Sequence, residues 1–322
     1  MTAQSITFRT FRNTDPPQLA AIWRSQEGQP NLAQPVSPDL LEQYLFAKLY
    51  FDYHGLIVAC EDDRLIGFAH AGFGPNEEEN GISTELGMTY LLLVRPNGPS
   101  LDLAAGLLQR SEAYLREKNA KILYGGGIRP LSAFYFGLYG GSELPGVLET
   151  DTLAQQVYPA CGYQEIERTL LFRRDLTTFE TPMERRQMQI RRQMIVEMTV
   201  DPPSRTWWEA CVTGEFCLTR FDAVPRGGGA PVASVTFREM ELAPGSCPSR
   251  SVGLVDLVVE ESFRRRGVAI FLLSEAFRQF IRQGATVVQA QAMQHNIAAL
   301  GMFRKLGFQQ ESQGSVFRKE IE

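Results

Sequence analysis

Two stretches of the chain can be laid on one another without a gap, at an offset of 145 residues. Asp151 then meets Asn296, and the register holds over 26 positions. The matched pairs include Ala154 with Ala299, Tyr158 with Phe303, Gly162 with Gly307, Tyr163 with Phe308, Gln164 with Gln309, Phe172 with Phe317, Arg173 with Arg318 and Asp175 with Glu320. Because helix positions, a helix-ending glycine and the following strand all keep register, the sequence predicts a duplicated unit.

The size and composition of the chain agree with two copies of one domain. It has 322 residues, roughly twice a typical domain of about 150. Hydrophobic residues make up 44% and charged residues 21%, which excludes a wholly disordered or collagen-like chain. The formal net charge of -5 argues against a bulk electrostatic grip on nucleic acid or on an anionic membrane. We expect neither as a partner.

The location of the protein is predicted from what the sequence lacks. No apolar run reaches the length of about 18 residues that a membrane span needs, and the first residues lack the order of a secretion signal. Five cysteines without CxxC spacing are typical of a reducing compartment, and with only three histidines no metal site is expected. The prediction is a cytoplasmic protein without a bound metal.

Hydrophobic periodicity predicts strands and helices in a similar order in each half. In the first half we expect strands at 6–11, 55–60, 65–70 and 88–94, and helices after Asp15, over 38–50 and from residue 101. In the second half we expect a strand at 252–259, a helix at 268–281, a strand at 285–293 and a helix at 296–306. The predicted domains are 1–176 and 194–322, joined by a solvated helical linker over 177–193.

A basic turn lies between the strand at 252–259 and the helix that follows it. Arg264, Arg265 and Arg266 precede Gly267, and Ala269 is in the first helical turn. Free amides at a helix start point outward with the positive end of the helix dipole, which predicts a phosphate site. Glycine allows close backbone approach, and arginines bind phosphate oxygens. The alternative is a solvated basic turn without a ligand.

These residues carry a family resemblance. Arg264-x-x-Gly267-x-Ala269 resembles the Q/R-x-x-G-x-G/A signature of the GCN5-related N-acetyltransferases (GNAT). Asn296-x-x-Ala299-x-x-x-Phe303-x-x-x-Gly307-Phe308 resembles the ending of the same family. The match covers residues 194–321 well and, through the offset, the first half weakly. The tandem arrangement resembles that of mycothiol synthase-like proteins.

The resemblance implies an α+β protein of two tandem GNAT domains, each a mixed, mainly antiparallel sheet flanked by helices. It also implies that acetyl-CoA binds the second domain as cosubstrate, with pantetheine along the backbone of 257–259 and pyrophosphate on the amides of 265–270. The cofactor residues implied in this way are Leu257, Val258, Val259, Arg264, Arg265, Arg266, Gly267, Val268, Ala269, Ile270, Asn296 and Phe303.

Each copy departs from the family pattern at one point. Phe303 stands where the family has its general-acid tyrosine, and a phenyl ring cannot protonate a thiolate. Tyr158 keeps the tyrosine in the first copy, but the corresponding phosphate loop, 95–100, contains Pro96 and Pro99. Because proline lacks an amide donor, we expect the first cofactor site to be degenerate.

The sequence indicates the general base less clearly than it indicates the cofactor site. Asp256 lies within an apolar strand, where a carboxylate is costly unless it is functional or paired, and it is the candidate base. The alternative is that a sheet irregularity turns it to solvent or to an arginine. Glu260 and Glu261 are weaker candidates. The segment 135–147 is either a turn-forming loop or an acceptor-facing lid that uses Tyr135, Tyr139 or Glu143.

The resemblance thus implies an acetyl-CoA-dependent N-acetyltransferase that acts on a small-molecule or peptide amine by direct transfer. By resemblance to tandem members, the first copy would support the fold and shape the acceptor cleft. Two alternatives stay open. One is a non-catalytic CoA-binding sensor, which Phe303 favours; the other is aminoacyl-tRNA-dependent transfer, which the acidic balance disfavours.

Overall fold

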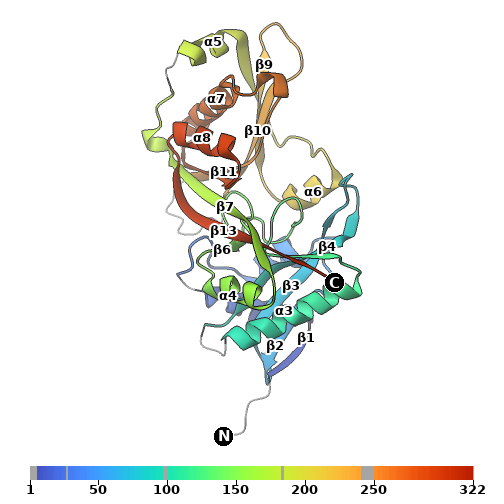
Figure 1. Cartoon of the computed structure of the whole chain (residues 1–322). Helices are drawn as coiled ribbons and strands as arrows, with labels where there is room; N and C mark the ends of the chain where they lie inside the picture. The colour runs from blue at the N-terminus through green and yellow to red at the C-terminus, as the bar shows by residue number, and fades with distance from the viewer. Residues whose placement is uncertain (1–5, 27, 97–99, 183–184, 241–249, 322) are drawn as a thin grey trace.

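A single mixed sheet runs through the whole molecule and joins its two halves (Figure 1). The computed structural model describes residues 6–26, 28–96, 100–182, 185–240 and 250–321. Within these residues the strand order is β1-β2-β3-β4-β5-β13-β7-β12-β11-β10-β9-β8, and β6 pairs with β13. The β4–β5 and β11–β12 pairs are parallel, whereas the other neighbouring strands are antiparallel. The predicted α+β class is confirmed.

The N-terminal half supplies the lower part of Figure 1. Its strands are β1 (Ile6–Thr10), β2 (Leu56–Glu61), β3 (Arg64–Pro75), β4 (Ile82–Val94), β5 (Ile122–Gly125), β6 (Val147–Leu148) and β7 (Gln164–Asp175). Its helices are α1 (Pro16–Arg24), α2 (Pro38–Leu41), the π-helical turn η1 (Glu42–Phe46), α3 (Ser100–Glu117), α4 (Thr152–Ala160) and the short η2 (Leu176–Thr178). The helix predicted over 38–50 therefore ends early.

The C-terminal half supplies the upper part. Its strands are β8 (Met194–Val200), β9 (Leu218–Pro225), β10 (Ala233–Glu239), β11 (Arg250–Val259), β12 (Ala285–Met293) and β13 (Gln309–Glu320). Its helices are α5 (Arg185–Gln193), α6 (Trp207–Thr213), the short η3 (Glu261–Phe263), α7 (Val268–Arg282) and α8 (Ile297–Lys305). The strands and helices predicted from residue 252 onward are confirmed.

The duplicated unit is present in the structure with the predicted register. The bounds of α8 and β13 are those of α4 and β7 moved by 145 residues at both ends. Asp151 and Asn296 each cap their helix by accepting a hydrogen bond from the amide three residues on, at 3.0 and 3.1 Å. Gly162 and Gly307 follow the two helices with φ of 85° and 74°, a conformation that favours glycine.

The last strand of each half pairs with the other half. β13 lies between β5 and β7, with Phe317 opposite Gly125, and β7 lies between β13 and β12, with Phe172 opposite Ala290. The chain therefore ends beside α3 of the N-terminal half (Figure 1). The sequence predicted a sheet in each half but not this exchange.

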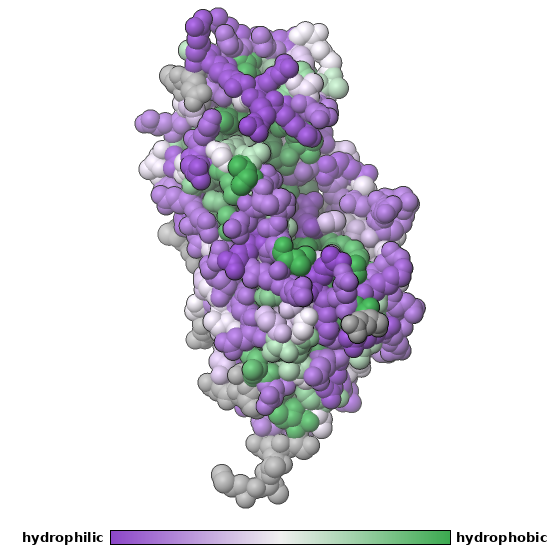
Figure 2. Space-filling model, viewed as in Figure 1, coloured by the Kyte–Doolittle hydropathy of each residue, from purple (hydrophilic) through white to green (hydrophobic). Residues whose placement is uncertain are grey.

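The halves also share a core. One cluster of buried residues combines N-terminal aromatic side chains with Trp208 and Val212 of α6 and Val255 of β11. A second cluster lies between the C-terminal sheet and α7 and α8. Figure 2 shows a mainly hydrophilic face with small apolar patches in both halves. No helix in the described ranges is long and apolar enough to cross a membrane.

Strand exchange makes a residue near the C-terminus part of the N-terminal core. Phe317 is buried and its ring stacks on Tyr158 of α4, with 5.3 Å between centroids. We expect Phe317→Ala to lower the free energy of unfolding by about 3–5 kcal/mol. Urea denaturation measures it, and Ile166→Ala on exposed β7 surface, expected to cost about 1 kcal/mol or less, is the control. Equal losses in the two variants would contradict the exchange.

Candidate functional site

Strands β11 and β12 separate midway along β11. Their parallel pairing ends where Gly253 faces Gln289, whereas β11 continues to Val259. Beyond this point β11 pairs only with β10 among the described strands, and Val258 is 47% exposed. A backbone edge without a strand partner can hydrogen-bond an extended ligand. This edge contains the predicted residues Leu257, Val258 and Val259.

The basic turn follows directly. Gly267 has φ of 84° and precedes α7, and the first helical hydrogen bond runs from the Phe271 amide to the Gly267 carbonyl at 3.1 Å. The amides of Val268, Ala269 and Ile270 therefore have no acceptor within the helix. Arg264, Arg265 and Arg266 are all exposed. The turn thus combines free amides, a helix N-terminus and cationic side chains, as the sequence predicts.

Helix α5 supports this turn, which the sequence did not predict. Arg186 donates to the Arg265 carbonyl at 2.6 Å, and Gln187 donates to the Gly267 carbonyl at 3.3 Å. Gln187 and Ile190 are buried, so the helix is not simply a solvated linker. Only the spacing of Gln187 and Ile190, three residues apart on one helix face, signals this packing. Part of the polar run considered for the linker, residues 183–184, lies outside the described residues.

The two remaining cofactor residues lie on α8. Asn296 is exposed at the helix start, just after β12. Phe303 is buried between the rings of Phe172 and Phe308, at 5.3 and 5.0 Å. It offers no polar atom to a ligand. His295, beside Asn296, forms an ion pair with Glu167 of β7.

Asp256 lies at a β-bulge of β11. The register with β10 passes from Asp256 to Leu254, which leaves Val255 without a partner residue. The Asp256 carboxylate is 29% exposed and pairs with Arg205 at 3.0 Å. The alternative in which an irregularity turns Asp256 to an arginine is therefore the one the structure adopts. Arg205 also binds Glu209 of α6 at 2.9 Å.

The loop that connects β5 to β6, residues 126–146, reaches from the N-terminal half to β11. Arg129 donates to the Glu143 carboxylate at 2.6 Å and to the Val255 carbonyl at 2.7 Å. Arg238 of β10 is buried and donates to the Ser142 and Gly141 carbonyls at 3.0 and 2.7 Å. The sequence singled out neither arginine, because nothing local marks an arginine that binds a distant loop.

The tyrosines of this loop do not face an acceptor. Tyr135 is 1% exposed and its hydroxyl lies 3.1 Å from His70 Nδ1, and Tyr139 is 4% exposed and accepts from the Leu148 amide at 2.8 Å. Of the two alternatives for this segment, a lid that uses Tyr135 or Tyr139 is excluded, because both rings fill the core between the halves. Glu143 alone of the three candidates is partly exposed, at 19% of its side chain.

Residues 178–308 match the model of the acetyltransferase (GNAT) family. A search of the curated proteins found no match. Among solved structures, the GCN5-related glucosamine N-acetyltransferase region of a fungal multi-domain β-N-acetylglucosaminidase is similar with a TM-score of 0.72 and 16% identity. The similarity covers 99% of this chain, which spans 38% of that protein. The matched residues therefore resemble the GNAT family, and the whole chain has the fold of this solved GNAT structure.

Two further structures extend the GNAT likeness over the whole chain. A GCN5-related N-acetyltransferase from Sphaerobacter thermophilus has a TM-score of 0.63 at 17% identity, covering 98% of this chain and 96% of that one. A tandem GNAT protein from the clavulanic acid biosynthesis pathway has a TM-score of 0.65 at 12% identity, covering 98% of each chain. At such identities the likeness shows the fold, and that fold is the tandem GNAT arrangement.

The first GNAT copy differs from the second at the corresponding strands. Pairing of β4 with β5 ends where Thr89 faces Gly125, yet β4 stays buried throughout its continuation from Tyr90 to Val94. The carbonyl of Val94 accepts from the Gln26 side chain at 2.9 Å. The N-terminal half thus covers with its own residues the edge that β11 leaves exposed. Residues 97–99 of the predicted proline-containing loop lie outside the described residues.

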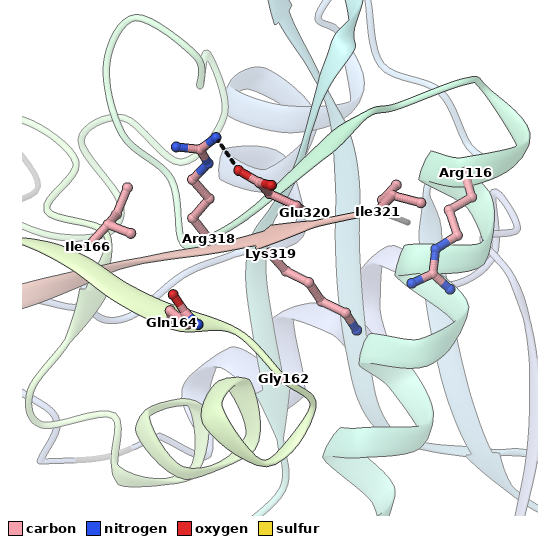
Figure 3. A pocket seen from close by; sticks show the side chains of 8 residues that line it. All are labelled: Arg116, Gly162, Gln164, Ile166, Arg318, Lys319, Glu320 and Ile321. Carbon is pink, nitrogen blue, oxygen red and sulfur yellow. Dashed lines mark hydrogen bonds and ion pairs between the residues drawn. The ribbon is translucent and has the colours of Figure 1, made fainter.

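A cavity of about 840 Å³ opens elsewhere, at the end of β13 beside α3 (Figure 3). Its basic residues are already engaged: Arg318 binds Glu320 at 2.9 Å, and Lys319 and Arg116 bind Glu112. Figure 3 shows Lys319 reaching from β13 toward α3, the helix that carries Arg116. The cavity has no residue in common with the basic turn before α7, and it is not part of the candidate site.

Asp151, the counterpart of Asn296, carries a charge where the second copy has none. Burial raises the pKa of Asp151 to about 6, which the bond from the Ala154 amide only partly offsets. A raised carboxyl pKa means that stability falls as pH rises from about 4 through about 6.

We therefore expect Asp151→Asn to raise the free energy of unfolding by about 1–2 kcal/mol at pH 7.5, because asparagine caps as well without the charge. The gain should shrink as the pH is lowered through this window. Urea denaturation at several pH values measures it. Asn296→Asp, at the exposed equivalent cap, should change stability by less than about 0.5 kcal/mol. A gain that is independent of pH would contradict the assignment to the Asp151 charge.

Proposed function

We propose that the protein is an acetyl-CoA-dependent N-acetyltransferase with its cosubstrate in the C-terminal half. This proposal rests on one observation. An unpartnered strand edge leads directly into a basic helix N-terminus. The edge lies on β11 and the basic turn begins α7, only a few residues later. An extended chain that ends in a pyrophosphate matches both features at once.

The residues present fit acetyl-CoA in their chemistry. Backbone groups of Leu257, Val258 and Val259 would pair with pantetheine, and the amides from Arg265 to Ile270 would bind pyrophosphate. Arg264, Arg265 and Arg266 would add charge-assisted hydrogen bonds to the phosphate oxygens. Asn296 would lie beside the cofactor arm, and Phe303 would contribute apolar surface only. When bound, acetyl-CoA supplies an activated acetyl thioester.

Transfer to an amine requires removal of a proton. An alkylammonium with a pKa near 10.4 is about 3 units from neutral pH, so deprotonation costs roughly 4–5 kcal/mol without help. Asp256 is the candidate base identified from the sequence, and it lies on β11 beside the edge described above. Phe303 cannot protonate the leaving thiolate, but a thiol with a pKa near 8.5 needs only about 2 kcal/mol of assistance, which water can supply.

The N-terminal half is proposed to shape the acceptor side rather than to bind a second acetyl-CoA. Its covered β4 edge and the prolines of its loop support this division. The acceptor is an amine of a small molecule or peptide. The similar fungal region is a GCN5-related glucosamine N-acetyltransferase, so amino sugars belong in the amine panel.

A non-catalytic CoA-binding protein of the same fold is the second candidate function. The buried Phe303 favours it, because the family's acid is absent from that position. Such a protein would bind CoA and acetyl-CoA without turnover over the amine panel.

Calorimetric titration of acetyl-CoA tests the cofactor site. We expect one site in the wild type, with an affinity reduced about 30- to 100-fold in Arg265→Glu/Arg266→Glu, because two charge-assisted contacts become repulsive. Arg282→Glu at the other end of α7 is the matched control and should bind as the wild type does. Two sites would contradict a degenerate first copy, and no binding would overturn the proposal.

Asp256→Asn tests the sequence-derived base. If Asp256 takes the proton, turnover of an accepted amine should fall at least about 10-fold near neutral pH and recover partly as the pH rises. Steady-state rates from pH 6 to 9 measure this. Unchanged turnover over the whole range would remove Asp256 from the reaction.

A further inference from the structure

We propose that Glu143, contributed by the N-terminal half, is the group that accepts the proton from the incoming amine. The inference rests on the proposed N-acetyltransfer in the C-terminal half. It gives the N-terminal half a catalytic residue and makes the active site a composite of both halves.

The position of the thioester follows from the direction of the cosubstrate. With pyrophosphate at the start of α7 and pantetheine along Val259 to Leu257, the reactive end continues toward Asp256 and Val255. Val255 is the bulged residue, and its carbonyl accepts from Arg129 at 2.7 Å. The same Arg129 nitrogen, Nη1, binds Glu143 Oε1 at 2.6 Å. One guanidinium nitrogen therefore joins Glu143 to the backbone at the reactive end.

The loop that carries Glu143 is held firmly on the C-terminal sheet. Arg238 binds the carbonyls of Gly141 and Ser142, and Gln291 of β12 donates to the Leu144 carbonyl at 3.0 Å. A Cβ on Gly253 would lie 3.0 Å from Ser142 Cα, so glycine permits this contact where β11 and β12 separate. These anchors fix the residues on both sides of Glu143 to three strands of the other half.

Polar atoms beside Glu143 have no partner within the described part of the chain. Ser142 is 1% exposed and its hydroxyl makes no hydrogen bond, and Gln291 Oε1 is likewise buried and unpaired. Buried polar atoms are normally satisfied, so these two atoms require a polar partner that the described residues do not supply. Among the described residues, Glu143 accepts a hydrogen bond through Oε1, and we assign Oε2 to the incoming ammonium.

The charged groups that surround Glu143 differ from those that surround Asp256. Burial raises the pKa of Glu143 and Asp256 raises it further, while Arg129 and Arg238 oppose the shift. Asp256 is the more exposed carboxylate and is held by Arg205, which Glu209 also binds. A base with a higher pKa gains more on taking a proton from an ammonium, provided that it is ionised at the working pH. The raised pKa makes Glu143 a better proton acceptor than a carboxylate with the ordinary value.

The step balances with the groups named. The ammonium gives one proton to Glu143 Oε2, and the freed nitrogen lone pair forms a bond to the thioester carbonyl carbon. The carbon–sulfur bond then breaks, the sulfur leaves with the electron pair, and the proton lost by the amide nitrogen is taken up by the thiolate through water. The products are an acetamide and CoA thiol, and Glu143 releases its proton to solvent.

Two acceptors of different basicity test the assignment. Ethylamine is almost fully protonated near pH 7.5, whereas hydroxylamine is mainly unprotonated and does not need a base before attack. We expect Glu143→Gln to lower kcat/KM for ethylamine about 100-fold, and that for hydroxylamine less than about 5-fold. Glutamine keeps an oxygen for Arg129. Thiol release measures both rates, and calorimetry should show acetyl-CoA affinity within about twofold of the wild type.

Glu215→Gln is the matched control, because Glu215 pairs with Lys48 across the two halves at 2.6 Å, away from β11. It should change neither rate by more than about threefold. Equal losses for both amines in Glu143→Gln would overturn the proposal in favour of a structural role. Retained ethylamine activity in Glu143→Gln, with loss in Asp256→Asn, would make Asp256 the base and leave the N-acetyltransfer standing. Acetyl-CoA binding without turnover of either amine by the wild type would overturn both.

Discussion

Strands β7 and β13 pair antiparallel along most of their lengths, and each also pairs with a strand of the opposite half. Through this pairing, β13 joins the sheet of the N-terminal half and β7 joins the sheet of the C-terminal half. Because β13 closes the N-terminal sheet, the stack of Phe317 on Tyr158 forms only when the chain has been made almost to its end. The two GNAT copies therefore depend on one another for stability, and the sheet edges at which they would otherwise end are abolished.

The exchange also places the β5–β6 loop against β10, β11 and β12. Arg238 is buried there, and burial lowers its pKa to about 10, an effect that Glu143 partly opposes. A buried guanidinium is costly unless its donors are satisfied. Carbonyls of Gly141 and Ser142 satisfy them, and the ring of Phe136 lies 4.7 Å from the guanidinium carbon. The cost of burying this charge is thus offset only when the loop is docked, which ties the loop's conformation to the contact between the halves.

Local patterns predicted local structure well, and their limits have a physical cause. The helix predicted at 296–306 and the turn at Gly267 are each encoded within a few residues. Short-range encoding explains why the GNAT motifs and most C-terminal elements were predicted. Partner choice in the sheet depends on residues more than a hundred positions apart, which periodicity does not report. The exchange of β7 and β13 was missed for that reason.

The residues of the candidate site likewise form two groups. Some are neighbours in the sequence, and others are brought together only by tertiary packing. Residues of the strand edge and the basic turn follow one another in sequence, so their proximity was predictable. Arg186 and Gln187 reach the turn through tertiary packing, and Arg129 reaches Val255 across the boundary of the halves. The sequence left the role of the loop's tyrosines open, because aromatic residues among glycines are equally typical of a lid and of a tightly turned core segment. Only burial distinguishes the two.

Divergence between the copies explains how one chain can use two similar folds for different tasks. At equivalent places the first copy buries the end of β4, whereas the second exposes the end of β11. The covered edge forms part of a rigid platform. From that platform the β5–β6 loop can hold Glu143 at the bulge of β11 through Arg129. A loop on a single domain would pay the full conformational entropy of ordering such a carboxylate, whereas here the shared core has already ordered it. The buried end of β4 and the anchored Glu143 carboxylate are, in this architecture, consequences of the same packing.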